Sequence, residues 1–219
     1  MRVYHFVNST FAISNISFRR LKISKFDQLN DPFELLAADL INPKHRIAFS
    51  KFKKILNLTK GMICFSATWN NPLLWGHYAD RHQGIALGFD VPDEFLSPVL
   101  YTTQRPQVIF NKLLGKINNG SVVVDRIIRS KYKDWEYEKE HRMFVDLNSH
   151  PQEGGLNFVD FASNLVLREV IVGLNCQLPL QQIKKLLSGD LEKVSLKKAG
   201  LALRSFKVIE DRSVRLPKS

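Results

Sequence analysis

The sequence has few cysteines and no long apolar run, and both absences narrow the range of functions. Cys64 and Cys176 are the only cysteines. Neither has a second Cys or a His at metal-ligand spacing, so we expect two buried, reduced thiols and no metal site. No apolar stretch approaches the roughly 20 residues of a membrane span, and the opening apolar segment stops at Val7, short of a signal-peptide core. We therefore expect a cytoplasmic protein without membrane association.

Acidic residues are in the minority: 32 Lys and Arg stand against 21 Asp and Glu, which gives a formal net charge of +11. The excess is concentrated in Arg19–Lys25, Lys51–Lys54 and 181–219, the last with ten basic and four acidic residues. Such a charge favours nucleic acid or another polyanion as partner. A solvated basic surface accounts for each cluster equally well.

The remaining composition is that of a globular protein, since 44% of the residues are hydrophobic and 15 are Phe. A chain of 219 residues without a linker-like stretch predicts a single domain over 1–219. We expect a core at 1–175 and a C-terminal helix and strand layer at 176–219. The elements predict an α+β or α/β fold with a mixed, mostly antiparallel central sheet flanked by helices. The sequence leaves the oligomeric state open.

Hydrophobic periodicity and turn residues predict alternating strands and helices. Strands are expected at 2–7, 21–24, 62–66, 85–89, 99–101, 137–146, 169–174, 194–196 and 203–209. Helices are expected at 11–16, 31–40, 45–56, 72–80, 106–117, 122–132 and 180–187. In the strand at 85–89 the small residues Ala86 and Gly88 share one face, which allows a ligand or another backbone to come close.

The densest polar segment, Trp135–Arg142, borders an apolar stretch. In an extended conformation, Glu138, Glu140 and Arg142 lie on one face. Two neighbouring carboxylates raise each other's pKa, and an adjacent cation restores the ionised state. The segment is therefore either a site for a ribose hydroxyl or a developing positive charge, or a solvent-facing row of ion pairs.

A second segment, Pro72–Ala79, is expected to be helical, with Trp75 and Tyr78 about one turn apart. That spacing is typical of core packing, which suits Trp75, whereas Tyr78 suits either the core or stacking on a bound ring. His77 lies outside the apolar stripe. Gly76 costs a helix about 1 kcal/mol relative to Ala, which predicts close packing there against another element or a ligand.

The segment from Asn30 to Glu34 has the residues of a helix start. Asp31 suits the N-cap, Pro32 the first helical position and Glu34 the reciprocal position of a capping box. Capping does not explain Asn30. We expect it in a loop that frames a pocket.

Together, a series of ordered motifs resembles a bacterial family known as domain of unknown function 2971. The motifs cover the chain from the first strand to the strand at 169–174, and the family label implies no reaction. The matching residues are Tyr4-His5, Leu29–Glu34, Cys64–Ser66, Leu74–Ala79 with Gly84 and Gly88–Asp90, Trp135 with Tyr137–Arg142, and Glu169–Gly173.

A more distant resemblance is to ADP-ribosyltransferases. It is carried by the order of His5, Ser66, Tyr78 and Glu140, and by Glu138-Lys139-Glu140, which looks like that family's Glu-x-Glu signature. The resemblance implies an ADP-ribosyltransferase-like fold and an enzymatic activity that consumes NAD. His5 would hold the NAD ribose and Tyr78 would stack on nicotinamide.

Either Glu138 or Glu140 is the catalytic carboxylate that this resemblance implies. Glu140 would bind the ribose 2′-hydroxyl and stabilise oxocarbenium character, while Glu138 would orient or deprotonate the acceptor. The overlapping Glu136-Tyr137-Glu138 leaves the assignment open. The other residues of the implied NAD site are Ser66, Trp75, His77, Asn30 and Arg142.

The resulting hypothesis is an NAD-consuming, ADP-ribosyltransferase-like protein, a toxin or phage-defence effector that acts on nucleic acid or protein. One alternative is a metal-dependent nuclease in which Asp31, Glu34, Glu138 and Glu140 collect Mg²⁺. Tyr137 stands where a common nuclease motif places a carboxylate, which counts against that alternative. The other alternative is a non-catalytic module that binds nucleic acid or a protein partner.

Overall fold

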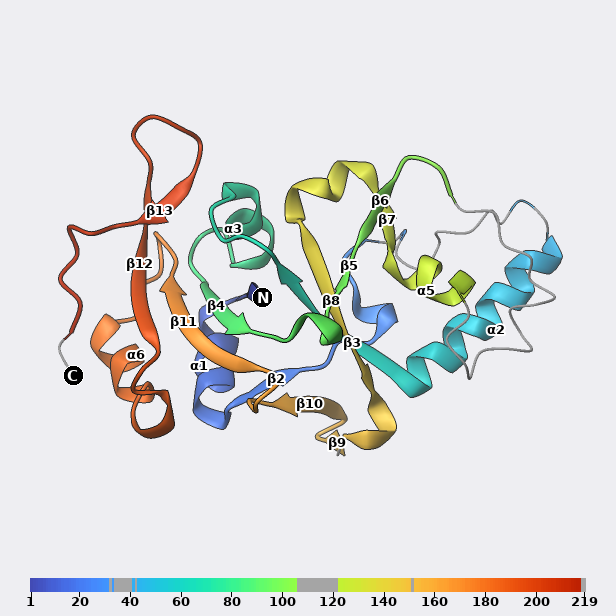
Figure 1. Ribbon diagram of the computed structural model, residues 1–219, viewed down its shortest axis with the longest axis horizontal. Helices are drawn as coiled ribbons and strands as arrows, with labels where there is room; N and C mark the ends of the chain where they lie inside the picture. The colour runs from blue at the N-terminus through green and yellow to red at the C-terminus, as the bar shows by residue number, and fades with distance from the viewer. Residues whose placement is uncertain (32, 34–40, 42, 106–121, 151, 218–219) are drawn as a thin grey trace. The chain divides into compact units, whose positions relative to one another are not determined.

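The computed structural model describes residues 1–31, 33, 41, 43–105, 122–150 and 152–217 (Figure 1). These residues form two compact units. Unit 1 comprises Met1–Leu21, Cys64–Phe95 and Val159–Ser219, and unit 2 comprises Lys22–Ile63 and Leu96–Phe158. Neither unit is a continuous segment of the chain. The expected single domain, with its core at 1–175, stays a prediction.

Unit 1 is built on a mixed, mostly antiparallel sheet, as expected. Its strand order is β13-β12-β11-β4-β1-β3. Neighbouring strands run antiparallel except β11 and β12, which are parallel and are joined through helix α6. The bounds are β1 (Arg2–Val7), β3 (Lys60–Ser66, whose last three residues belong to unit 1), β4 (Ile85–Asp90), β11 (Val166–Val172), β12 (Ser195–Leu201) and β13 (Val208–Glu210).

Helices flank this sheet. Helix α1 (Ser9–Phe18) contacts β4 and α6 (Leu180–Leu186), whereas α3 (Pro72–Tyr78) contacts β1. Local sequence fixes α1, because the Asn8 side chain caps it by accepting from the amide of Phe11, and Arg19 ends it in a left-handed conformation. Two 3-10 turns, Asp93–Phe95 and Gly189–Leu191, complete unit 1.

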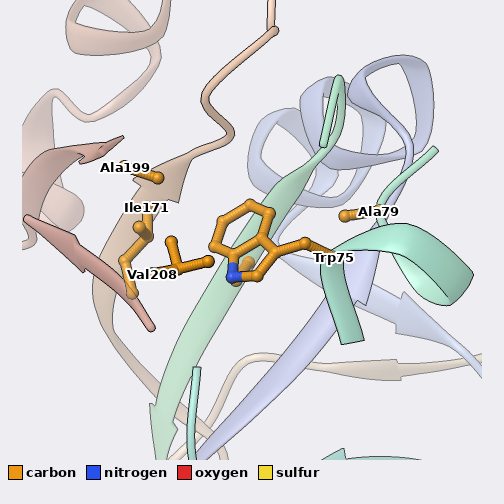
Figure 2. Close-up of a cluster of buried hydrophobic side chains, with 6 residues drawn as sticks. Trp75, Ala79, Ile171, Ala199 and Val208 are labelled. Carbon is orange, nitrogen blue, oxygen red and sulfur yellow. The ribbon is translucent and has the colours of Figure 1, made fainter. Parts of the chain in front are cut away.

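A tryptophan organises the core between α3 and the sheet. Trp75 is fully buried and packs in a cluster with Ala79, Ala86, Ile171, Ala199 and Val208. Figure 2 labels all of these residues except Ala86. The small alanines on the strands leave room for the indole. Its Nε1 donates to the carbonyl oxygen of Trp69 at 2.7 Å, so the buried polar atom is satisfied.

The turn that follows α3 has an unusual backbone. Asp80, Arg81 and His82 are consecutive non-glycine residues with φ of 45°, 53° and 69°, a conformation that costs L-residues roughly 1–2 kcal/mol each. The turn is tied down, because Gly84 donates to the carbonyl of Ala79 at 2.7 Å. A Cβ on Gly84 would collide with the Val7 carbonyl oxygen. Close backbone packing thus explains this glycine.

Unit 2 contains shorter strands and one long helix. Strands β5 and β8 pair antiparallel, β6 and β7 parallel, and β9 and β10 antiparallel. The bounds are α2 (Pro43–Thr59), β5 (Ser97–Pro98), β6 (Leu100–Thr102), α5 (Val122–Arg129), β7 (Ser130–Tyr132), β8 (Glu140–Asp146) and β9 (Gln152–Glu153), with 3-10 turns at Phe26–Gln28, Lys133–Glu138 and Leu147–Ser149. Strands β2 (Arg20–Lys22) and β10 (Leu156–Asp160) pass from one unit into the other.

Most predicted elements are present, and three predictions are wrong in part. The helix expected at 122–132 ends at Arg129, and residues 130–132 form strand β7. Residues 137 and 138 belong to a 3-10 turn, so the strand expected at 137–146 begins at Glu140. The strand expected at 203–209 begins at Val208, because a loop precedes it. The predicted helices at 31–40 and 106–117 fall on segments outside the described residues, apart from Asp31 and Phe33. Within the described residues, no helix has the length and apolarity needed to span a bilayer.

Replacing Gly84 with Ala is expected to lower the free energy of unfolding by about 1–3 kcal/mol, because overpacking forces the backbone to shift. The new Cβ would lie 2.1 Å from the Val7 carbonyl oxygen. Gly76→Ala is the control: apart from its chain neighbours and the nearby helix backbone, no described atom lies within 4 Å of its Cβ, so the higher helix propensity of Ala should add up to about 1 kcal/mol. Denaturant unfolding measures both. A stable G84A protein would contradict the packing described here.

Candidate functional site

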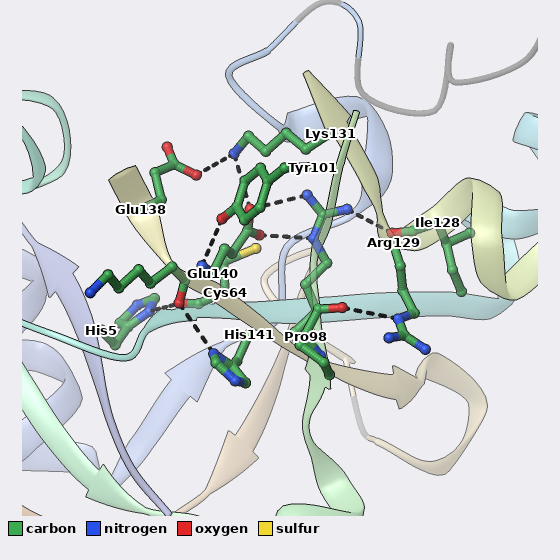
Figure 3. Close-up of polar contacts among 12 residues, drawn as sticks. His5, Cys64, Pro98, Tyr101, Ile128, Arg129, Lys131, Glu138, Glu140 and His141 are labelled. Carbon is green, nitrogen blue, oxygen red and sulfur yellow. Dashed lines mark hydrogen bonds and ion pairs between the residues drawn. The ribbon is translucent and has the colours of Figure 1, made fainter. Parts of the chain in front are cut away.

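The two carboxylates of the Glu-x-Glu sequence converge on one lysine in unit 2. The Nζ of Lys131, on β7, donates to Glu138 Oε2 at 2.6 Å and to Glu140 Oε2 at 3.0 Å. Figure 3 shows the ammonium between the two side chains, with the second oxygen of Glu138 pointing away from it. An ammonium has three donors, and here two of them serve carboxylates. We call Lys131, Glu138, Glu140 and Arg142 the Lys131 cluster.

Arg142 holds the other side of Glu140. Its Nε donates to Glu140 Oε1 at 2.8 Å and its NH2 to Oε2 at 3.2 Å, the forked geometry that makes arginine–carboxylate pairs strong. NH1 donates to the carbonyl oxygen of Ile128 at 2.6 Å. Both oxygens of Glu140 therefore accept bonds from cations.

The Lys131 cluster is buried, which decides its electrostatics. The side chains of Lys131, Glu138, Glu140 and Arg142 are 4%, 5%, 6% and 1% exposed. Burial alone would raise the pKa of Glu140, but the charges of Arg142 and Lys131 outweigh it and lower the pKa to about 2. The two cations balance the two carboxylates, so Glu140 stays ionised in a site that excludes water.

Aromatic side chains surround the Lys131 cluster. Lys131 Nζ lies 5.0 Å from the centre of the Trp135 ring, within reach of a cation–π interaction. The Tyr101 hydroxyl accepts from the amide of Glu140 at 2.8 Å. Burial, with the charge of Glu138, raises the pKa of Tyr137 to about 12. These rings and the neutral phenol of Tyr137 form a rim of partly exposed groups around the ionised carboxylates.

The backbone reaches this arrangement by a route that the sequence pattern did not predict. Glu138 ends a 3-10 turn and Lys139 is left-handed, with φ of 47°. The extended geometry expected to place Glu138 and Glu140 on one face of a strand is therefore wrong. The reversal at Lys139 brings both carboxylates to Lys131 instead. Sequence analysis missed Lys131 and Tyr101. A cation near Glu138 and Glu140 could have been expected, because buried carboxylates require one.

In unit 1 the sheet separates two of the predicted NAD-binding residues. Tyr4 is opposite both Ser66 and Gly88, so these three residues share one face. His5, the next residue along β1, faces the other side. There its Nδ1 lies 2.9 Å from the carbonyl oxygen of Cys64 and its ring packs against Phe65. Burial lowers the pKa of His5, and the bond to Cys64 opposes that shift.

The other predicted residues have contrasting environments. Trp75 is buried, with the ring of Phe6 against its edge and the ring of His82 stacked at 6.3 Å. His77 is exposed and Tyr78 is half-buried on the same helix. Within the described residues, the close packing expected at Gly76 is not found.

The remaining expectations concern Asn30, the helix start at Asp31, the two cysteines and metal binding. Asn30, in unit 2, is exposed. Asp31 is buried and accepts from the amide of Phe33 at 2.8 Å, whereas Glu34 lies outside the described residues. Cys64 and Cys176 are free thiols, but Cys64 is partly exposed rather than buried. In the described part of the chain, no group of three or more His, Cys, Asp or Glu is placed to hold a metal ion.

Unit 1 also carries a charged row that sequence analysis did not single out. Glu169 accepts from Arg2 at 2.9 Å and from Lys197 at 3.1 Å, and the Tyr4 hydroxyl donates to it at 3.3 Å. The Tyr4 ring lies over Gly88, since a Cβ there would meet it at 3.0 Å. The close approach predicted at Gly88 is therefore made by a side chain of the same sheet.

A family model described as "Protein of unknown function (DUF2971)" matches residues 74–143. This segment resembles the DUF2971 family. It contains most of α3, strand β4 and the Lys131 cluster, so the resemblance seen there is confirmed. The family motifs at Tyr4-His5, Leu29–Glu34, Cys64–Ser66 and Glu169–Gly173 lie outside the DUF2971 match. No curated protein and no solved structure matches the chain.

Replacing Arg142 with Met should lower the free energy of unfolding by about 3–5 kcal/mol, because a buried carboxylate would lose its partner. Arg168→Met is the matched control, since Arg168 is 48% exposed in its pair with Asp90 and exposed pairs contribute about 1 kcal/mol or less. Denaturant unfolding of both variants makes the comparison. Equal losses would show that the Lys131 cluster is not a buried ionic centre.

The stability of the protein should also fall in acid because of Glu140. Its pKa is lowered from 4.5 to about 2 in the folded state, so its contribution is complete above the unfolded pKa and is lost as pH falls through the folded one. We expect Glu140→Gln to be less stable than the parent at neutral pH and to lose less stability on acidification. Glu136→Gln, at a 58% exposed side chain, should retain the parental pH dependence. Parallel curves for E140Q and the parent would contradict the assignment.

Proposed function

We propose that this protein consumes NAD in a glycosyl-transfer reaction of the ADP-ribosyltransferase type, with the Lys131 cluster as its reaction centre. The observation that carries the proposal is the convergence of Glu138 and Glu140 on Lys131 in a water-excluding site. Such transfer needs an ionised carboxylate beside the carbon where positive charge develops. Glu140 shows that this environment keeps a carboxylate ionised.

The two carboxylates have different roles in this proposal. Glu140 is a positioning residue, because both its oxygens accept from Arg142 and Lys131. We assign contact with the sugar to Glu138, whose carboxylate is held by Lys131 (Figure 3) and lies close enough to the partly exposed Tyr137 to raise its pKa. Lys131 thereby fixes the Glu138 carboxylate and limits its negative charge.

The chemistry follows from this arrangement. The bond between ribose C1′ and the nicotinamide nitrogen breaks, and nicotinamide leaves with the bonding electrons and becomes neutral. Glu138 accepts a hydrogen bond from the 2′-hydroxyl and stabilises the oxocarbenium character left on the ribose. An acceptor nucleophile then forms a bond to C1′ and releases its proton to solvent. Trp135 and Tyr137, as partly exposed rings beside Glu138, offer stacking surfaces for the bases of NAD.

The remaining candidates for NAD binding have supporting or undecided roles. We assign Arg142 to holding Glu140, and Trp75 and His5 to the structure of unit 1. Ser66, His77, Tyr78 and Asn30 stay predicted ligand contacts. A cytoplasmic location and a nucleic-acid or protein acceptor are part of the same proposal.

A metal-dependent nuclease has less support. Glu138 and Glu140 share an ammonium rather than an arrangement of oxygen ligands. Asp31 uses one oxygen to cap the turn at Phe33. The nuclease hypothesis predicts cleavage of nucleic acid that needs Mg²⁺ and ignores NAD, so the same preparation tests both functions.

Incubation of the purified protein with radiolabelled NAD, followed by separation of nucleic-acid and protein fractions, tests the proposal. We expect label in one fraction, release of nicotinamide, and a loss of about 10²–10³-fold in Glu138→Gln, as for removal of one transition-state stabilising group. Glu136→Gln is the control, because Glu136 is exposed and pairs with Lys133. Circular dichroism verifies that E138Q is folded. Absence of both NAD binding in calorimetry and label transfer would overturn the proposal.

A further inference from the structure

The loop between β12 and β13 of unit 1 exposes two large apolar side chains completely. Leu203 is 100% and Phe206 is 99% exposed, and Leu201 at the start of the loop is 58% exposed. All three side chains line one hollow, and exposed apolar side chains grouped in this way mark a contact surface. In Figure 1 the loop extends beyond the ends of the two strands.

The loop is held at its base rather than hanging from the sheet. The amide of Ala202 donates to the carbonyl of Lys207 at 3.0 Å. Asn70 fixes the start of β13 twice, because its carbonyl accepts from the Val208 amide and its side chain donates to the Val208 carbonyl, both at 2.8 Å. The exposed ring of Phe206 therefore lies on a hairpin that is anchored at its base. Less conformational entropy is then lost on binding.

The hairpin also borders a hollow of about 540 Å³, a size typical of ligand sites. Apolar and basic groups share its lining, and none of its residues is acidic. The lining residues are Pro72, Leu201, Ala202, Leu203, Arg204, Ser205, Phe206 and Lys207. We call this surface the hairpin hollow.

We infer that the hairpin hollow binds single-stranded nucleic acid. Phe206 offers a ring face on which an unpaired base stacks, and Arg204 and Lys207 on either side of it supply cations for the flanking phosphates. Exposed Arg212 and Arg215 add further cations after the acidic pair Glu210-Asp211, in a protein whose net charge is +11.

Two features favour a single strand over other polyanions. In a duplex the base faces are stacked on one another and cannot reach Phe206, whereas unpaired bases are splayed and accessible. Arg204 and Lys207 lie close to Phe206 in the chain, which suits a stacked base with its flanking phosphates, and binding to an anionic bilayer is tested as the competing outcome. The inference is independent of glycosyl transfer, because binding needs no NAD.

Fluorescence anisotropy with labelled single-stranded oligonucleotides, in the absence of NAD, tests the inference. Phe206→Ala should weaken binding roughly 5- to 150-fold, the loss that corresponds to one stacked base. Arg204→Ala should reduce the slope of log K against log salt by about 0.7 for each phosphate that the variant no longer neutralises. Both side chains lie on an exposed loop, so the variants should fold, which circular dichroism verifies.

Matched controls are available in the same unit. Phe11→Ala removes an exposed phenylalanine on α1, 61% exposed, and Lys185→Ala removes an exposed lysine on α6. Both should bind as the parent does.

Three results would overturn the inference. These are no binding of single strands by the parent, equal affinity of F206A and the parent, or binding of phosphatidylglycerol vesicles or duplex in place of single strands. A protein that binds single strands but transfers no label from NAD would leave the inference standing and overturn the proposed function alone.

Discussion

The shared ammonium of Lys131 is the constraint on which the chemistry of unit 2 depends. Two carboxylates enclosed together would repel each other and take up protons. Lys131 lies within 2.6 Å of one and 3.0 Å of the other, and Arg142 neutralises the rest of the charge. The result is a buried site that holds Glu140 ionised at neutral pH, which is the environment that electrostatic catalysis requires.

Local structure and charge pairing depend on each other here. The 3-10 turn at Lys133–Glu138 and the left-handed Lys139 set the directions of both glutamates. Without the cations, this turn would bury two uncompensated charges. The resulting loss of folding free energy would exceed the total stability of a marginally stable fold. Without the turn, β8 alone could bring only Glu140 to Lys131. The Lys131 cluster therefore couples the fold of this segment to its proposed chemistry.

Sequence periodicity predicted the regular elements well and the special backbone poorly. The strands at Arg2–Val7 and Ile85–Asp90 and the helix from Pro72 have strong signals: alternation in the strands and Asn-Pro at the helix start. The left-handed Lys139 has no such signal, because lysine rarely adopts positive φ. Glu138 and Glu140 were singled out from their polar context, whereas Lys131 was missed, since only tertiary structure brings β7 beside them.

The account rests on Glu140 being ionised inside the folded protein. Carbon-13 NMR of the side-chain carboxyl groups, followed as a function of pH and assigned with Glu140→Gln, measures this most directly. A Glu140 signal that titrates near pH 2, well below its ordinary pKa of 4.5, is the predicted result. Titration at or above 4.5 would mean that Lys131 and Arg142 do not hold the carboxylate ionised, and would contradict the account.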